Sequence, residues 1–163
     1  MLADGNEILR KSVAKMSRDS RGRVRLEQLE PDSPSRMILV QDPEGRSGFS
    51  YNPSTGRAQT FGTKKAGGAS APRMQGAPLG KSVLDGIPVE GTRQTTVIPA
   101  GQIGNAKPLI ILDESWYSAD LQLILKSQHS DPRSGVVTYR LTAIERKEPD
   151  SKLFEIPAGA KVQ

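Results

Sequence analysis

The chain has 163 residues, of which 35% are hydrophobic, and its formal net charge is +5. A domain of this length can bury about 70% of its unfolded surface, so disulfide or metal cross-links are not needed for stability. Cysteine is absent, which excludes a disulfide framework, a thiolate zinc site and a cysteine nucleophile.

The positive charge lies in the first half of the chain. Residues 1–82 contain 14 Lys and Arg against 8 Asp and Glu, whereas residues 83–163 contain 9 against 10. A basic region attracts anionic partners, but arginines that alternate with apolar residues are also typical of a solvated strand face. No stretch approaches the ~20 apolar residues of a membrane-spanning helix, and no apolar signal-peptide region follows Met1.

The chain begins with a turn signal. Asp4-Gly5-Asn6 favours a two-residue hairpin, but almost nothing precedes it that could form the first strand. We therefore expect that an upstream strand, and any signal peptide before it, are missing from this sequence. Residues 7–18 favour a strand, with a short amphipathic helix as the alternative.

Three turn sequences divide the next region. DSRG (19–22), DPEG (42–45) and NPSTG (52–56) each begin with Asp or Asn, and each final Gly is followed by Arg. Segments 23–29, 36–41 and 47–51 between and beside these turns have the length of strands. In segment 23–29, Val24 and Leu26 alternate with charged residues, which is the pattern of a half-buried strand.

Composition changes in the middle of the chain. Residues 62–78 are rich in Gly, Ala, Pro and Lys without periodicity, which predicts a flexible loop. We expect this loop to lie inside a single domain spanning residues 1–163, since neither half has enough apolar residues for its own core. Residues 79–99 resume extended structure, with Asp85-Gly86 and Glu90-Gly91 as turn or bulge signals.

The region from 109 to 156 is predicted as three antiparallel strands and a return segment. The strands are expected at 109–117, 120–128 and 136–146, connected by tight turns. A single helical turn beginning at Pro149 or Asp150 is expected to place Leu153 and Phe154 on the sheet. Alternation predicts that one face of the strands points to the core, namely the face with Leu121, Leu123, Leu125, Val137, Tyr139, Leu141 and Ala143.

Residues able to carry catalysis are few. The single histidine, His129, would need Asp113 or Asp131 and a serine to form a triad, and hydrogen bonding near Asp131 in a turn is the simpler expectation. Asp113 and Glu114 are adjacent on a strand and so point to opposite faces. The sequence contains no phosphate-loop or dinucleotide-binding motif. We therefore predict a non-enzymatic protein without cofactor or metal; the alternative is a hydrolase that uses Asp113 or Glu114 with His129.

The two aromatic residues that end segment 109–117 point to opposite faces. We expect one of Trp116 and Tyr117 to pack in the core and the other to lie at a rim. The arginine-rich stretch 21–25 has no aromatic residue nearer than Phe49, which argues against nucleic-acid binding.

Six motifs follow one another along nearly the whole chain. They are RDSRGRVRLEQ (18–28), QDPEGRSGFSYNPSTGRAQ (41–59), LGKSVLDGIPVEGTRQTTVIPAGQIGN (79–105), ESWYSADLQ (114–122), HSDPRSGVVTYRL (129–141) and EPDSKLFEIPAG (148–159). In this order they resemble a family of uncharacterised, predicted exported bacterial proteins that is common in acidobacteria. The D-x-x-G-R strand starts, the W-Y pair and the closing L-F-x-I-P resemble, more distantly, the outer-membrane lipoprotein carrier and anti-sigma-factor regulator group.

The resemblance implies a fold and a place of action. The distant group has an antiparallel half-barrel around an apolar cavity, so we expect a mainly β protein with a curved, half-barrel-like antiparallel sheet and at most one or two short helices. The resemblance to exported proteins also implies that this protein is periplasmic or secreted, although this sequence carries no signal peptide. Members of the family have a further strand before the A-D-G-N turn, where this chain has Met1.

Two binding functions follow as hypotheses. In the first, the concave sheet face binds a lipid-like or apolar ligand through Leu121, Leu123, Leu125, Tyr139, Leu141 and Trp116. In the second, the chain docks on an acidic protein partner through a basic patch of Arg21, Arg23, Arg25, Arg36, Arg46 and Arg57.

Overall fold

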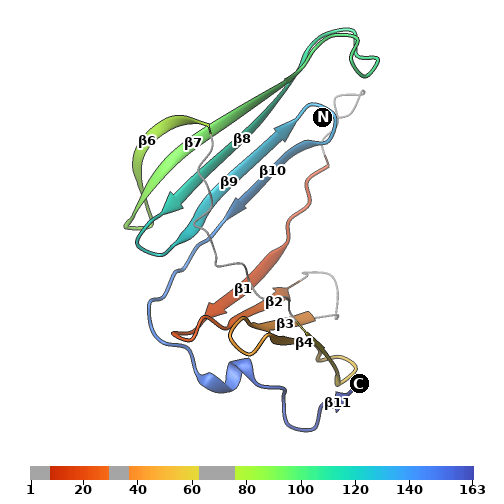
Figure 1. Ribbon diagram of the computed structural model, residues 1–163, viewed down its shortest axis with the longest axis vertical. Coiled ribbons are helices and arrows are strands. Elements are labelled where there is room, and N and C mark those ends of the chain that lie inside the picture. The colour runs from red at the N-terminus through yellow and green to blue at the C-terminus, as the bar shows by residue number, and fades with distance from the viewer. Residues whose placement is uncertain (1–7, 30–36, 63–75) are drawn as a thin grey trace. The chain divides into compact units, whose positions relative to one another are not determined.

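The protein is mainly β. The structure, a computed structural model, describes residues 8–29, 37–62 and 76–163, and over these residues it contains eleven strands and one 3-10 turn (Figure 1). This confirms the prediction of a mainly β fold with antiparallel strands and few helices. The strands form two open sheets instead of one.

The chain divides into two compact units. One contains residues 70–145, and the other contains residues 2–69 together with the C-terminal segment 146–163. The single domain over residues 1–163 stays a prediction. Most of the predicted loop 62–78 lies outside the described residues, and its two ends belong to strands β5 (Arg57–Gly62) and β6 (Ala77–Leu84).

The N-terminal unit is a six-stranded sheet. Its first five strands are antiparallel neighbours in chain order, and the short C-terminal strand pairs parallel with β5. The strands besides β5 are β1 (Val13–Arg18), β2 (Val24–Leu29), β3 (Met37–Asp42), β4 (Ser47–Asn52) and β11 (Lys161–Val162). The strand predicted within residues 7–18 is confirmed for β1, whereas the turn predicted at residues 4–6 lies outside the described part of the chain.

The three predicted turns connect these strands. The carboxylate of Asp42 accepts a hydrogen bond from the Gly45 N–H at 2.8 Å, and the side-chain oxygen of Asn52 accepts one from the Ser54 N–H at 2.9 Å. Such bonds are the reason that Asp and Asn begin turns. Gly56 has a positive φ of 65°, whereas in the middle turn Arg46 takes this conformation, with a φ of 48°.

The core of this unit joins the first half of the chain to its end. Ile38 and Val40 of β3 and Phe49 of β4 pack with Phe154 from the 3-10 turn η1 (Ser151–Phe154). Asp150 caps η1 by accepting a hydrogen bond from the Lys152 N–H at 3.0 Å. The predicted helical turn and its start are confirmed, but Phe154 packs on the N-terminal sheet and not on the sheet of the strands that precede it in sequence.

The charged residues of β2 point inward. An alternating strand normally buries its apolar residues instead. Arg25 lies opposite the buried Val40, and its side chain is 13% exposed, whereas Leu26 is 39% exposed. The cause lies in the C-terminal segment, because the carbonyl oxygen of Leu153 accepts a hydrogen bond from Arg25 Nη1 at 3.1 Å. A long-range partner thus reverses the burial expected from local pattern.

The second unit is a five-stranded antiparallel sheet of order β10-β9-β8-β7-β6. Besides β6, its strands are β7 (Ile87–Ile98), β8 (Leu109–Ser118), β9 (Leu123–Asp131) and β10 (Gly135–Arg140). Asp85-Gly86 forms the predicted turn, and both residues have positive φ. Gly91, by contrast, lies inside β7, where a Cβ would come within 2.7 Å of the Trp116 ring. That glycine leaves room for the tryptophan to lie across β7.

The last predicted strands are shorter than expected. β9 begins at Leu123, after a turn in which Gln122 has a φ of 53°, and β10 ends at Arg140. The prediction that Val137 and Tyr139 face the core is wrong, since they are 65% and 46% exposed. Both lie on the face opposite the apolar cluster of this sheet, and β10 is an edge strand with little to cover it.

Candidate functional site

The apolar residues predicted to bind a ligand mostly form the core of the second unit. Five of the six pack in one cluster with the buried Ile87 and Val89, and Leu125 is only 1% exposed. These five residues are Trp116, Leu121, Leu123, Leu125 and Leu141. Side chains of the protein itself therefore occupy the contacts that these residues can make.

Tyr139, the sixth predicted residue, is separated from this cluster. Within β10 it lies opposite Ser127 of β9, which in turn lies opposite Ser115 of β8. Odd-numbered residues of β8 point away from the face of Trp116. Partial burial raises the pKa of Tyr139 above its usual value, and the pairing places it on the opposite face of the sheet.

The face of Trp116 carries further apolar residues outside this cluster, which we call the apolar strip: the exposed Val97, Ile110 and Val136 and the half-buried Leu112. Val97 lies opposite Ile110, and Leu112 and Val136 both lie opposite Ser130. Val97, Ile110 and Val136 are 54%, 52% and 62% exposed. A group of neighbouring exposed apolar side chains on a sheet face is a candidate contact surface.

The apolar strip was missed from sequence although a signal was present. Leu109 to Leu112 form a continuous apolar run, and alternation places half of that run on each face of the sheet. Because nothing in the sequence says where the core ends along a strand, the exposed part could not be told from the buried part.

Charged residues separate the apolar strip from the core. Arg93 lies opposite Glu114 and donates to its carboxylate, with Nε 2.8 Å from Oε1. Lys126 lies opposite Trp116 on the same face, and beside it Arg140 reaches Asp85 at 3.2 Å. The strip is therefore apolar at one end and bordered by ionic groups at the other.

The six predicted basic residues are dispersed. Arg23 and Arg25 are covered by the C-terminal segment, and Arg36 lies outside the described residues. Arg21 and Arg46 are exposed in turns at one end of the N-terminal sheet, whereas Arg57 begins β5 at the other end. Docking on an acidic partner stays a prediction, with Arg21 and Arg46 as its available cations.

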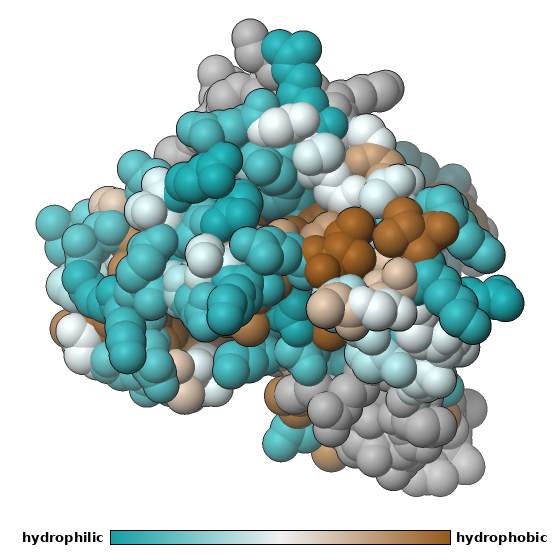
Figure 2. Space-filling view, turned by 90° about the horizontal axis from the view of Figure 1, so that it is seen from below, coloured by the Kyte–Doolittle hydropathy of each residue, from teal (hydrophilic) through white to brown (hydrophobic). Residues whose placement is uncertain are grey.

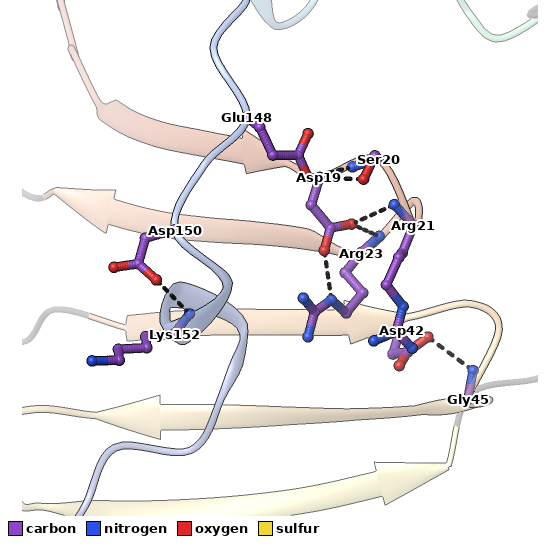
Figure 3. A network of polar contacts seen from close by, with 9 residues as sticks. All are labelled: Asp19, Ser20, Arg21, Arg23, Asp42, Gly45, Glu148, Asp150 and Lys152. Carbon is purple, nitrogen blue, oxygen red and sulfur yellow. Dashed lines mark hydrogen bonds and ion pairs between the residues drawn. The ribbon is translucent and has the colours of Figure 1, made fainter.

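A polar network explains why Arg23 is covered (Figure 3). Its Nε lies 2.6 Å from Asp19 Oδ2, and its guanidinium lies 4.8 Å from the centre of the Phe154 ring. Glu148 accepts hydrogen bonds from the backbone N–H and the hydroxyl of Ser20, both at 2.9 Å. These contacts tie the C-terminal segment to the β1–β2 turn, and we assign them to folding.

His129 has a carboxylate partner, but not the one expected. Its Nδ1 lies 2.6 Å from Asp113 Oδ1, directly across the β8–β9 pair, whereas Asp131 binds Arg133. Asp113 and Glu114 do point to opposite faces, as predicted, since Glu114 binds Arg93. Ser127 shares the face of His129 two residues along the strand, which corresponds to a Cα separation of about 6.6 Å.

Metal binding finds no support in the geometry. Within the described residues, no group of three or more His, Asp or Glu side chains is arranged to hold an ion. Those same residues contain no helix of the length and hydrophobicity that crossing a bilayer requires.

Comparison with known proteins adds no family. No protein-family model matches the chain, and no curated protein matches it either.

Proposed function

We propose that this chain is a non-enzymatic binding protein whose second unit takes a lipid-like or apolar ligand on the face of its sheet that carries Trp116. The observation that supports this proposal most is the apolar strip. Its residues continue the core-bearing face of the sheet, yet three of them are more than half exposed. Figure 2 shows one side of the molecule, where hydrophilic residues cover most of the surface and a few hydrophobic groups lie among them.

The energetics favour an extended ligand. Covering a whole Val or Ile side chain contributes about 1.5–3 kcal/mol, and roughly half of that remains available at each exposed position. A ligand must therefore contact several residues of the strip at once, as an acyl chain lying along the sheet would.

The charged border favours an amphipathic ligand. The Arg93–Glu114 pair lies in the row between Leu112 and Trp116, and Lys126 follows one row further. An acyl chain on the strip would bring its polar head to this border, where hydrogen-bond donors and a positive charge are present. A fatty acid or a lysophospholipid has this chemistry.

Energy transfer from Trp116 to cis-parinaric acid, a fluorescent fatty acid, tests the proposal. Trp116 is the only tryptophan, so transfer reports a ligand near this unit. We expect saturable transfer, and Ile110→Asp should weaken the affinity about tenfold, since a carboxylate against the acyl chain loses at least the ~1.4 kcal/mol of such a change.

Leu26→Asp on the exposed face of β2 is the matched control, because it adds the same charge to the other unit. Its affinity should equal that of the wild-type protein. Absence of saturable transfer, or equal affinities for Ile110→Asp and wild type, would contradict the proposal.

We also propose that the protein acts outside the cytoplasm, in the periplasm or secreted. Support comes from the resemblance described above. Fractionation of the source bacterium with an antibody to the chain tests this, and recovery with cytoplasmic markers alone would contradict it.

A further inference from the structure

The outer edge of β10 presents regularly spaced backbone groups. Among the described residues, β10 pairs with β9 alone. The Leu141 N–H donates to the Leu125 carbonyl at 2.8 Å, just beyond the strand end and in the same register. Hydrogen-bonded positions alternate along an antiparallel pair, so the odd-numbered residues of β10 bond to β9. The N–H and C=O groups of Val136, Thr138 and Arg140 therefore point outward.

This edge lacks the features that normally protect an edge strand. Charged residues, proline, bulges or very short length discourage pairing with another chain. The only charged residue of β10 is Arg140 at its end; residues 136–139 are Val-Val-Thr-Tyr, and β10 pairs regularly along its length.

The other three edges each have such protection. β6 contains Pro78 and Lys81 and shifts register between Pro78 and Gly80. β1 carries Lys15 in its interior, and β11 is two residues long. The open edge at β10 is therefore distinctive among the edges that the structure describes.

We propose that a second copy of this chain pairs with β10 through its own β10, antiparallel and related by a two-fold axis perpendicular to the sheet. This interface is independent of the proposed ligand. A perpendicular axis keeps each face continuous, so residues directly opposite each other must both be even or both be odd in number.

The outward groups fix the register further. Centring the pair on Thr138 places Thr138 opposite its own copy and Val136 opposite Arg140, with all outward groups bonded. Val137 then lies opposite Tyr139 twice, an aromatic and β-branched pairing that stabilises sheets. The two Arg140 side chains lie at opposite ends of the interface, so their charges do not oppose the pairing.

The proposed interface is small, so the dimer should be weak and its formation should depend on protein concentration. About six backbone hydrogen bonds would form across the two strands. An interface of this size belongs to the weak class, so we expect a dimer in the micromolar range that dissociates on dilution. Pairing uses up the open edge, so assembly should stop at two chains.

Analytical ultracentrifugation of the full chain tests the dimer. Wild type and Thr138→Val should form dimers with rising concentration, whereas Thr138→Pro should sediment as a monomer because it removes an outward N–H. Thr138→Lys should do the same without touching the backbone, since it places two like charges directly opposite. Circular dichroism checks that each variant keeps its strands.

Cross-linking tests the register. The chain has no cysteine, so Thr138→Cys introduces a single thiol that would meet its own copy at a Cα separation of about 5.5 Å, suitable for a disulfide. Val83→Cys on the opposite edge strand, 64% exposed, is the control. We expect oxidation to link the first variant and not the second. A wild-type protein that stays monomeric, a dimer that survives Thr138→Lys, or linkage at Val83→Cys as fast as at Thr138→Cys would overturn the proposal.

Discussion

At the scale of single residues, two carboxylates hold turns together by pairing with an arginine further along the turn. Arg133 donates to Asp131 from its side chain and its backbone, and these bonds lower the pKa of Asp131 to about 2. In the N-terminal unit, burial raises the pKa of Asp19, but hydrogen bonds from the Arg23 side chain and backbone outweigh it, so the net shift is downward. Such sites make stability depend on pH.

The sign of that dependence can be tested at Asp131. A lowered pKa in the folded state means that its contribution is present above about pH 4 and is lost as pH falls toward 2. We expect Asp131→Asn to be less stable than wild type at pH 5 and equally stable at pH 2. Urea unfolding followed by Trp116 fluorescence measures this, since both residues belong to one unit. A difference that is the same at both pH values would contradict the assignment.

At the scale of elements, η1 is the piece that covers the N-terminal sheet. Phe154 is 5% exposed among Ile38, Val40 and Phe49. Phe154→Ala should destabilise this unit by about 3–5 kcal/mol, because it leaves a cavity in a small core. Circular dichroism should show an early transition, while the transition reported by Trp116, which lies in the other unit, should keep its urea midpoint. Equal shifts in both signals would show instead that the chain unfolds as one domain.

The elements also show which features of the fold could be predicted from the sequence. The turns at 19–22, 42–45 and 52–56 were predictable because each is fixed by a hydrogen bond within five residues. The inward side of β2 was not, since the partner of Arg25 is Leu153, 128 residues away. The cluster around Leu125 followed from alternation, whereas Tyr139 was assigned to the wrong face because β9 shifts register at Leu125, so the odd-numbered residues before and after the shift point to opposite faces.

At the scale of the whole molecule, two sheets bury their apolar residues in separate small clusters. The cluster of the second unit covers only part of its sheet, and the apolar strip is the remainder of the same face. We propose that a ligand binds the apolar strip, so its test must distinguish binding on this face from binding on the opposite face of the sheet.

Val136 and Val137 provide that test. They are neighbours on β10, similarly exposed at 62% and 65%, and they point to opposite faces. Aspartate at either position adds one charge to the same edge, and titration at a protein concentration at which the chain is monomeric keeps strand pairing out of the comparison. Titration with cis-parinaric acid should show that Val136→Asp binds about tenfold more weakly than Val137→Asp, which should resemble wild type. Equal affinities for the two variants, or a larger loss for Val137→Asp, would contradict a ligand site on the apolar strip.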